Sequence, residues 1–181
     1  MEKYSEFNDP YTGINPFLRP RCVRIGMGVL IRALVVLPVY ILYRLGLVSV
    51  RRIITVEEKR RIPLYKKIYA NSVGEFDEEI IRSSCDVRGT LLFPEGATTN
   101  NRCILSYGDE KCDYVVGLRY SPECIYSGGS RLTWLIRFLG SRRRVVVDCE
   151  RGSNLERVTG LKQVKLTQKD KEKFIKKTLR E

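Results

Sequence analysis

Residues 71–102, NSVGEFDEEIIRSSCDVRGTLLFPEGATTNNR, contain the two polar segments on which the predicted fold depends. In the second segment, the apolar run 91–93 is typical of a buried strand, and it stops at Pro94. A loop rich in Thr and Asn follows and ends at Arg102. Backbone N–H groups, hydroxyls and a fixed cation after a buried strand suit a phosphate, although an ordinary strand-to-helix turn has the same spacing.

The first segment, residues 71–77, precedes a short predicted helix at 76–83. The helix has three acidic residues in its first turn, Asp77, Glu78 and Glu79, where the helix dipole favours negative charge. The stretch from Ser72 to Asp77 therefore lies between a predicted strand and a predicted helix. Such a junction is a usual place for a site in an open α/β sheet.

Both segments resemble conserved blocks of the glycerolipid acyltransferases, membrane enzymes that acylate lysophosphatidic acid and related lysophospholipids. Residues 93–100, FPEGATTN, followed by Arg102, resemble the FPEGT block of that family. Where the family has a His, four residues and then an Asp, this chain has Ser72 and Asp77, and it contains no His. Residues 1–4, 12–14 and 16–18 are similar to the start of the fungal lysophosphatidic acid:oleoyl-CoA acyltransferases of endoplasmic reticulum and lipid droplets, a subgroup that also has a non-His residue in this frame.

The resemblance implies acyl-CoA-dependent acylation of lysophosphatidic acid or a related lysophospholipid. It places Asp77 and Ser72 in the catalytic frame. It assigns the pocket for the substrate phosphate to five further residues, which are Glu95, Gly96, Thr98, Thr99 and Arg102. No metal and no bound cofactor are expected, because acyl-CoA enters as a co-substrate.

Two departures from the family keep a second hypothesis open. Ser72 is not basic near neutral pH, and Asp77 is a weak base unless burial raises its pKa. Losing a general base costs about 10²–10⁴-fold in rate, which still permits a slow enzyme. Only seventeen residues separate Asp77 from Glu95, and the Gly-Phe-Arg block that helps the family bind glycerol phosphate is absent. The alternative is a catalytically inactive lipid-binding scaffold.

The charge of the chain predicts a polyanionic partner. Its 181 residues include 33 Lys and Arg against 21 Asp and Glu, a formal net charge of +12. A nucleic acid is the remote alternative to an anionic membrane, because the sequence has no RNP, helix-turn-helix or zinc pattern. The six cysteines have no paired spacing, which indicates reduced thiols in a cytosol-facing protein.

Residues 23–50 are the predicted membrane element. The uncharged run 33–43 is eleven residues, about 16 Å as helix, which is too short to cross a hydrocarbon core of about 30 Å. The longer segment 25–48 includes Arg32 and Arg44 but remains apolar enough to insert into a membrane. Basic residues on both sides place both ends on the cytosolic face of the reticulum or of a lipid droplet. We expect a membrane helix or a hairpin bent near Pro38; the alternative is a buried core helix.

The predicted organisation has four parts: a polar N-terminal segment at 1–22, the membrane element at 23–50, an acyltransferase-like α/β domain at 51–166 and a basic C-terminal helix at 167–181. Within the α/β domain, strands are expected at 52–58, 65–71, 91–94, 114–120 and 145–149, with an amphipathic helix at 130–139. These form a small mixed sheet with flanking helices. Thr167 and Asp170 have the spacing of a capping box for the last helix.

Overall fold

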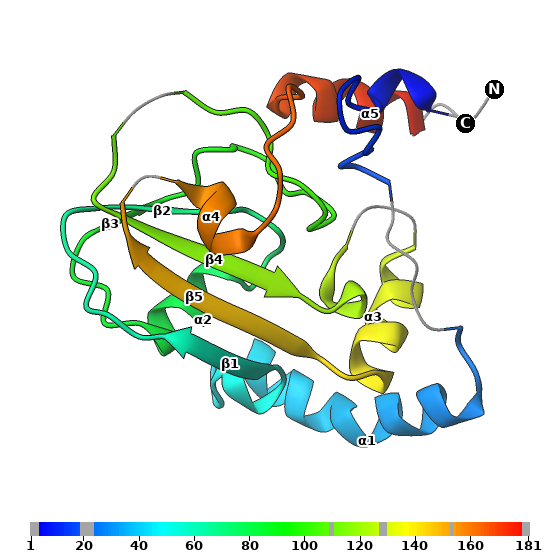
Figure 1. Cartoon of the computed structure of the whole chain (residues 1–181). Helices are drawn as coiled ribbons and strands as arrows, with labels where there is room; N and C mark the ends of the chain where they lie inside the picture. Colours follow the sequence, from blue (N-terminus) through cyan, green and yellow to red (C-terminus); the bar gives the residue numbers. More distant parts are fainter. Residues whose placement is uncertain (1–3, 19–23, 109–110, 127–129, 153, 179–181) are drawn as a thin grey trace.

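One mixed sheet lies at the centre of the computed structural model, which describes residues 4–18, 24–108, 111–126, 130–152 and 154–178 (Figure 1). Its strands are β1 (Thr55–Arg60), β2 (Lys67–Ala70), β3 (Thr90–Leu92), β4 (Tyr114–Tyr120) and β5 (Arg144–Arg151), in the spatial order β1-β5-β4-β2-β3. Only the β4–β5 pair is antiparallel; the other three neighbouring pairs are parallel. The expected mixed sheet with flanking helices is confirmed.

The first strand begins later than predicted. Residues Val50–Arg52 form a 3-10 helix instead of strand, and β1 starts only at Thr55. Val50, Ile53 and Ile54 are all buried, and a spacing of three and four residues between apolar positions belongs to a helical turn rather than to a strand. The other strand bounds lie close to the predicted ones, and β4 spans the predicted residues.

Alternate residues of β4 face two different layers. Val116 and Leu118 belong to the main core, together with residues of helices α2 (Asp77–Ser84) and α3 (Arg131–Gly140). Val115 points to the opposite face, where it packs with residues of α4 (Leu155–Thr159), a short helix that the sequence did not predict. The sheet is therefore covered on both faces, as its nearly continuous apolar strands require.

Helix α1 (Met27–Arg44) packs along α3, and its C-terminal end contacts α2 through Tyr43, whereas much of its outer face is exposed (Figure 1). Pro38 lies inside it, and the helix runs on to Arg44 before the chain turns at Gly46. The hairpin alternative is therefore wrong, because proline removes one hydrogen bond of the helix without reversing the chain. Only 11% of the helix is buried, so it is not the buried core helix of the other alternative.

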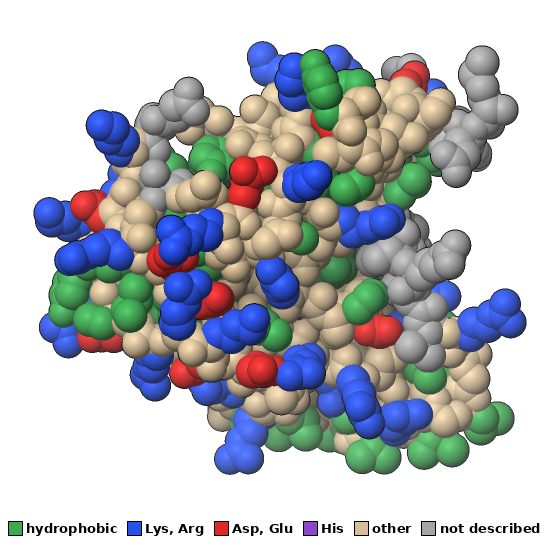
Figure 2. Space-filling view, viewed as in Figure 1, with side chains coloured by type: hydrophobic (Ala, Val, Ile, Leu, Met, Phe, Trp, Pro, Cys, Tyr) green, Lys and Arg blue, Asp and Glu red, His purple; other side chains and the backbone are tan. Residues whose placement is uncertain are grey.

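Among the described residues, α1 is the one helix long and apolar enough to cross a membrane, a test that signal sequences also pass. Its exposed apolar side chains include Met27, Ile31, Leu34, Val35, Ile41 and Leu42. In the space-filling view, hydrophobic side chains gather along the lower rim, where Figure 1 places α1 (Figure 2). An exposed apolar face of this kind marks an interaction surface.

The two ends of the described chain meet on one side of the sheet (Figure 1). Helix α5 (Gln168–Thr178) contributes Phe174, which contacts Phe7 and Phe17 at ring distances of 5.3 and 5.6 Å. The polar N-terminal segment contains a 3-10 turn at Ser5–Phe7. The capping box of α5 is confirmed, because the carboxylate of Asp170 accepts hydrogen bonds from the backbone N–H and hydroxyl of Thr167 at 2.9 Å.

Candidate functional site

The structure brings the two polar segments into direct contact. Strands β2 and β3 are parallel neighbours, so the loops that follow them leave the same edge of the sheet. The backbone N–H of Ser72 donates to Glu95 Oε1 at 2.8 Å, and the N–H of Thr99 donates to the carbonyl of Ser72 at 3.1 Å. Ser72 is thus fixed through both of its backbone groups by the FPEGATTN loop.

Asp77 is buried and holds its own loop closed. Its Oδ2 accepts from the N–H groups of Val73 and Gly74 at 2.7 and 3.0 Å, and its Oδ1 accepts from the hydroxyl of Tyr120 at 2.6 Å. Burial raises the pKa of Asp77 to about 6, although these three hydrogen bonds oppose the rise. The carboxylate therefore supports the loop rather than facing open space.

Glu95 has a matching role in the second loop. It is buried, and its two oxygens accept from the backbone N–H groups of Ser72 and Leu105 at 2.8 and 2.7 Å. Burial raises the pKa of Glu95 to about 7. Each oxygen of both carboxylates already accepts a hydrogen bond from the protein, so the acids join the loops to each other and to the sheet.

The remaining predicted phosphate ligands lie in different surroundings. Thr99 is buried, and Thr98 is half-buried, with its carbonyl and hydroxyl accepting hydrogen bonds from Lys171 of α5. Gly96 has a φ of 64°, and a Cβ there would lie 2.5 Å from Gln168 Oε1. Arg102 is exposed and lines neither of the cavities described below. The structure therefore brings Ser72, Glu95 and Thr99 together but leaves Arg102 apart.

An open groove of about 710 Å³ lies beside these loops. Its floor and walls come from both loops, from α1, from α3 and from the segment between β4 and α3. The lining residues are Tyr40 and Arg44 of α1; Gly74, Glu75 and Thr98 of the loops; Cys124 and Tyr126; and Arg131, Leu132, Trp134 and Leu135 of α3. The sequence had pointed to the two loops, whereas the contributions of α1 and α3 were not predicted.

The groove combines apolar walls with two cations and one carboxylate, that of Glu75. Leu132, Trp134 and Leu135 supply apolar surface from α3. Arg44 and Arg131 are exposed, and within the described part of the chain neither forms an ion pair with a carboxylate. This is the arrangement that an amphiphile with an anionic headgroup requires.

The basic C-terminal helix lines a second cavity, of about 690 Å³, together with the N-terminal turn. Two of its lysines are already paired with acids, because Lys173 lies 3.6 Å from Asp170 and Lys177 lies 2.5 Å from Glu6. This cavity is therefore less suited to an anion than the groove is. The described residues contain no group of three or more His, Cys, Asp and Glu that could hold a metal ion.

Comparison of the chain with protein-family models, with curated proteins and with solved structures gave no match. The resemblance to the glycerolipid acyltransferases therefore rests on the motif residues themselves.

Proposed function

We propose that this chain is a membrane-associated, acyltransferase-like protein of glycerophospholipid synthesis that binds a lysophospholipid such as lysophosphatidic acid. The observation that carries this proposal is the groove. It joins the two loops that resemble the acyltransferase blocks to an apolar wall and to two arginines without carboxylate partners. One end of such a groove suits a phosphate, and the other suits an acyl chain.

The headgroup would lie between Arg44 and Arg131. Arginine presents a planar fork of N–H donors that matches phosphate oxygens, and such charge-assisted hydrogen bonds are about twice as strong as neutral ones. The hydroxyl of Thr98 lies on the same lining. The acyl chain would follow Leu132 and Leu135, whose burial by the lipid contributes about 25 cal/mol per Å² of apolar surface.

The exposed face of α1 would seat the protein on the cytosolic face of the endoplasmic reticulum or of a lipid droplet. Its apolar side chains fit the acyl region of the lipid, and Arg24, Arg51 and Arg52 are exposed near its two ends. Basic residues that flank an apolar helix contribute about 1 kcal/mol each near an anionic membrane surface. Because α1 also lines the groove, a lysophospholipid would enter directly from the membrane.

Acyl transfer from acyl-CoA is the candidate activity of this site. It is favoured by the contact between Ser72 and the FPEGATTN loop, since a retained acyltransferase frame needs its two blocks held together. In the reaction, the acceptor hydroxyl loses its proton as it attacks the thioester carbonyl. Both oxygens of Asp77 already accept hydrogen bonds within the protein, so Asp77 is not free to remove that proton, and Ser72 has no basic group. The groove would then accelerate the reaction only by orienting the two substrates. Without a general base, we expect turnover to be slow.

The decisive experiment uses the full chain in detergent micelles with labelled oleoyl-CoA and lysophosphatidic acid. Binding of lysophosphatidic acid at micromolar concentration supports the proposal, and labelled phosphatidic acid above a heat-denatured control adds the enzymatic activity. Binding without product leaves the inactive lipid-binding scaffold. A salt-sensitive shift with RNA, together with no binding to lipid, would overturn the proposal in favour of a nucleic-acid binder.

The variant Ser72→His sharpens the same assay. It restores the basic side chain of the family frame at a half-buried position whose backbone is already fixed. We expect the rate of product formation to rise by about 10-fold or more, because a general base contributes about 10²–10⁴-fold when it is well placed. A half-buried position of the second loop, Thr98→His, serves as the control and should not raise the rate.

A further inference from the structure

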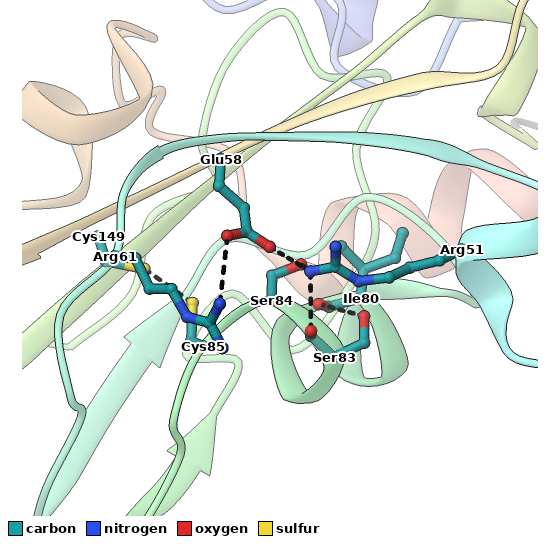
Figure 3. A network of polar contacts seen from close by, with 8 residues as sticks. All are labelled: Arg51, Glu58, Arg61, Ile80, Ser83, Ser84, Cys85 and Cys149. Carbon is teal, nitrogen blue, oxygen red and sulfur yellow. Dashed lines mark hydrogen bonds and ion pairs between the residues drawn. The ribbon is translucent and has the colours of Figure 1, made fainter.

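Two buried cysteines from distant parts of the chain are in contact. Cys85 follows the last residue of α2, and Cys149 lies in β5; their sulfur atoms are 3.0 Å apart (Figure 3). The two residues are 64 positions apart in sequence, which is why no spacing revealed the pair. Both are free thiols, and within the described residues no other two cysteines are in contact.

Charged side chains surround this pair. Figure 3 shows Arg61 beside the sulfurs and Arg51, from the 3-10 helix at 50–52, against the last turn of α2. Glu58 lies between the two arginines. Arg51 donates to the carbonyl of Ser83 at 2.8 Å and to the hydroxyl of Ser84 at 3.2 Å, so it ties the end of the helix to β1 through Glu58. The pair therefore lies just beneath a layer of ion pairs that is open to solvent on its outer side.

The two sulfurs differ in their readiness to react. The hydrogen bond between the two sulfurs lowers the pKa of Cys85, and the positive charges of Arg61 and Arg51 act in the same direction, whereas burial and Glu58 oppose them. The same hydrogen bond, together with burial, raises the pKa of Cys149. A thiolate is the reactive form of cysteine, and positive charge beside a sulfur favours it, so with Arg61 next to the pair we assign the attacking role to Cys85.

The two cysteines lie in different backbone settings. Cys149 is fixed in the sheet opposite Val116, whereas Cys85 caps α2 in an extended conformation with φ −122° and ψ 148°. A disulfide has an S–S distance of about 2.05 Å, so the sulfurs, now 3.0 Å apart, must move closer by about 1 Å.

We propose that Cys85 and Cys149 form a redox-active pair that a peroxide converts into an intramolecular disulfide. The Cys85 thiolate attacks one oxygen of hydrogen peroxide; the O–O bond breaks, and hydroxide leaves and takes up a proton to form water. The resulting sulfenic acid is attacked by the Cys149 sulfur; the S–O bond breaks, the S–S bond forms, and the hydroxide leaves as water with the Cys149 proton. Two thiols are oxidised and one peroxide is reduced to two waters.

The disulfide would attach one end of α2 to the sheet while the other end carries Asp77 and the first loop of the groove. Oxidation therefore fixes the helix on which that loop is built. It closes a loop of about 64 residues, for which we expect a rise in melting temperature on the order of 10 °C. The chemistry of the pair does not depend on whether the groove binds lipid.

The test treats the folded full chain with stoichiometric hydrogen peroxide, blocks remaining thiols and maps tryptic peptides without reduction. We expect peptide 83–88 linked to peptide 145–151, with the loss of two hydrogens and reversal by dithiothreitol. Cys103, which is equally buried and whose pKa burial raises to about 12, should remain a free thiol. In Cys149→Ser, Cys85 should stop at a sulfenic acid that dimedone traps.

Two results would overturn the proposal. One is full alkylation of Cys85 and Cys149 after peroxide treatment, to the same extent as Cys103, which would show two packed thiols without redox chemistry. The other is the appearance of disulfides between Cys85 and several different cysteines, in amounts that rise with the peroxide concentration, which would show oxidation of unfolded chains. Both readouts use the wild-type protein, so they do not depend on whether a variant folds.

Discussion

The carboxylates of Asp77 and Glu95 support the two loops beside the groove, whereas the guanidinium groups of Arg44 and Arg131 line the groove itself, and the two pairs lie in opposite surroundings. The carboxylates are buried, and every oxygen accepts a hydrogen bond from the protein. The arginines are exposed, and among the described residues they have no carboxylate partner. The two block carboxylates therefore hold the loops in place, while both cations that face the space where a ligand would lie come from outside those blocks.

Removing a buried carboxylate should have the largest effect, and it should be on stability. Asp77→Ala leaves two backbone N–H groups and the Tyr120 hydroxyl without their acceptor, at about 1–3 kcal/mol for each buried group. We expect the free energy of unfolding in urea to fall by about 3–5 kcal/mol. Glu78→Ala, one residue further on the exposed face of the same helix, should cost less than about 0.5 kcal/mol. Equal stabilities of the two variants would contradict the supporting role of Asp77.

The same carboxylates predict an unusual dependence of stability on pH. Burial raises the folded-state pKa of Asp77 to about 6 and that of Glu95 to about 7, whereas unfolded values are about 3.9 and about 4.3. Between about pH 4 and pH 7 the folded chain holds more protons, so stability should fall as pH rises through this window, by about 3 kcal/mol for Glu95 alone. Melting curves of wild type and Glu95→Gln measure this. Glu95→Gln should be less stable than wild type at low pH, and its melting temperature should change less between pH 4 and pH 7. An equal change of melting temperature with pH in both proteins would exclude Glu95 as the cause.

Removing the arginines should affect binding and leave stability alone. The double variant Arg44→Ala and Arg131→Ala should weaken the affinity for lysophosphatidic acid by about 10–100-fold. Each substitution removes a charge-assisted hydrogen bond to the phosphate worth about 1.5–3 kcal/mol, and water that hydrates the freed phosphate offsets part of that loss. Isothermal titration in micelles gives the affinity, and the melting temperature should change by less than about 2 °C. Arg82→Ala, an exposed arginine of α2 paired only with Glu78, is the control. An equal loss in both variants would place the phosphate elsewhere.

A charge on the outer face of α1 should weaken membrane attachment. Val35 is 71% exposed, and Val35→Glu would place a carboxylate where the lipid is expected. We expect the fraction of protein that floats with anionic vesicles to fall by about 10-fold, since a buried charge costs about 2–3 kcal/mol in a helix within the membrane. Ile175→Glu adds the same charge to a partly exposed apolar position of α5 and should float as wild type does. If both variants float equally, α1 is not the attachment surface.

The smallest expected effect concerns the contact of α5 with the second loop. Lys171 donates to the carbonyl of Thr98 at 2.5 Å and to its hydroxyl, and burial lowers the pKa of this lysine. Lys171→Met keeps the apolar stem and removes the donors, so lysophospholipid affinity should fall by about 3–10-fold, the equivalent of about 1 kcal/mol. Lys169→Met, on the exposed face of the same helix, should bind as wild type does. Titration of both variants decides whether α5 contributes to the site.

The features that the sequence predicted well depend on neighbouring residues. The capping box of α5, the amphipathic helix α3 and the strand-to-helix junction before Asp77 are set by local hydrogen bonding and short-range periodicity. The 3-10 turn at 50–52 was missed because its apolar residues fit either pattern in so short a window.

The groove and the cysteine pair could not be found in the same way. Arg44 and Arg131 come from helices about ninety residues apart that meet only because α1 packs on α3. Cys85 and Cys149 are brought together by the packing of α2 against the sheet. No local rule connects such positions, and Arg102, the cation that adjacency in sequence favoured, lies outside the groove.

Photocrosslinking with a lysophosphatidic acid that carries a diazirine on its acyl chain tests the central claim most directly. The account predicts that illumination of the full chain in micelles labels α3 at Leu132 or Leu135 and that unlabelled lysophosphatidic acid competes the label away. Labelling should fall in the Arg44→Ala and Arg131→Ala double variant and persist in Arg82→Ala. Label confined to the outer face of α1, or spread without competition over the surface, would contradict a lysophospholipid site in the groove.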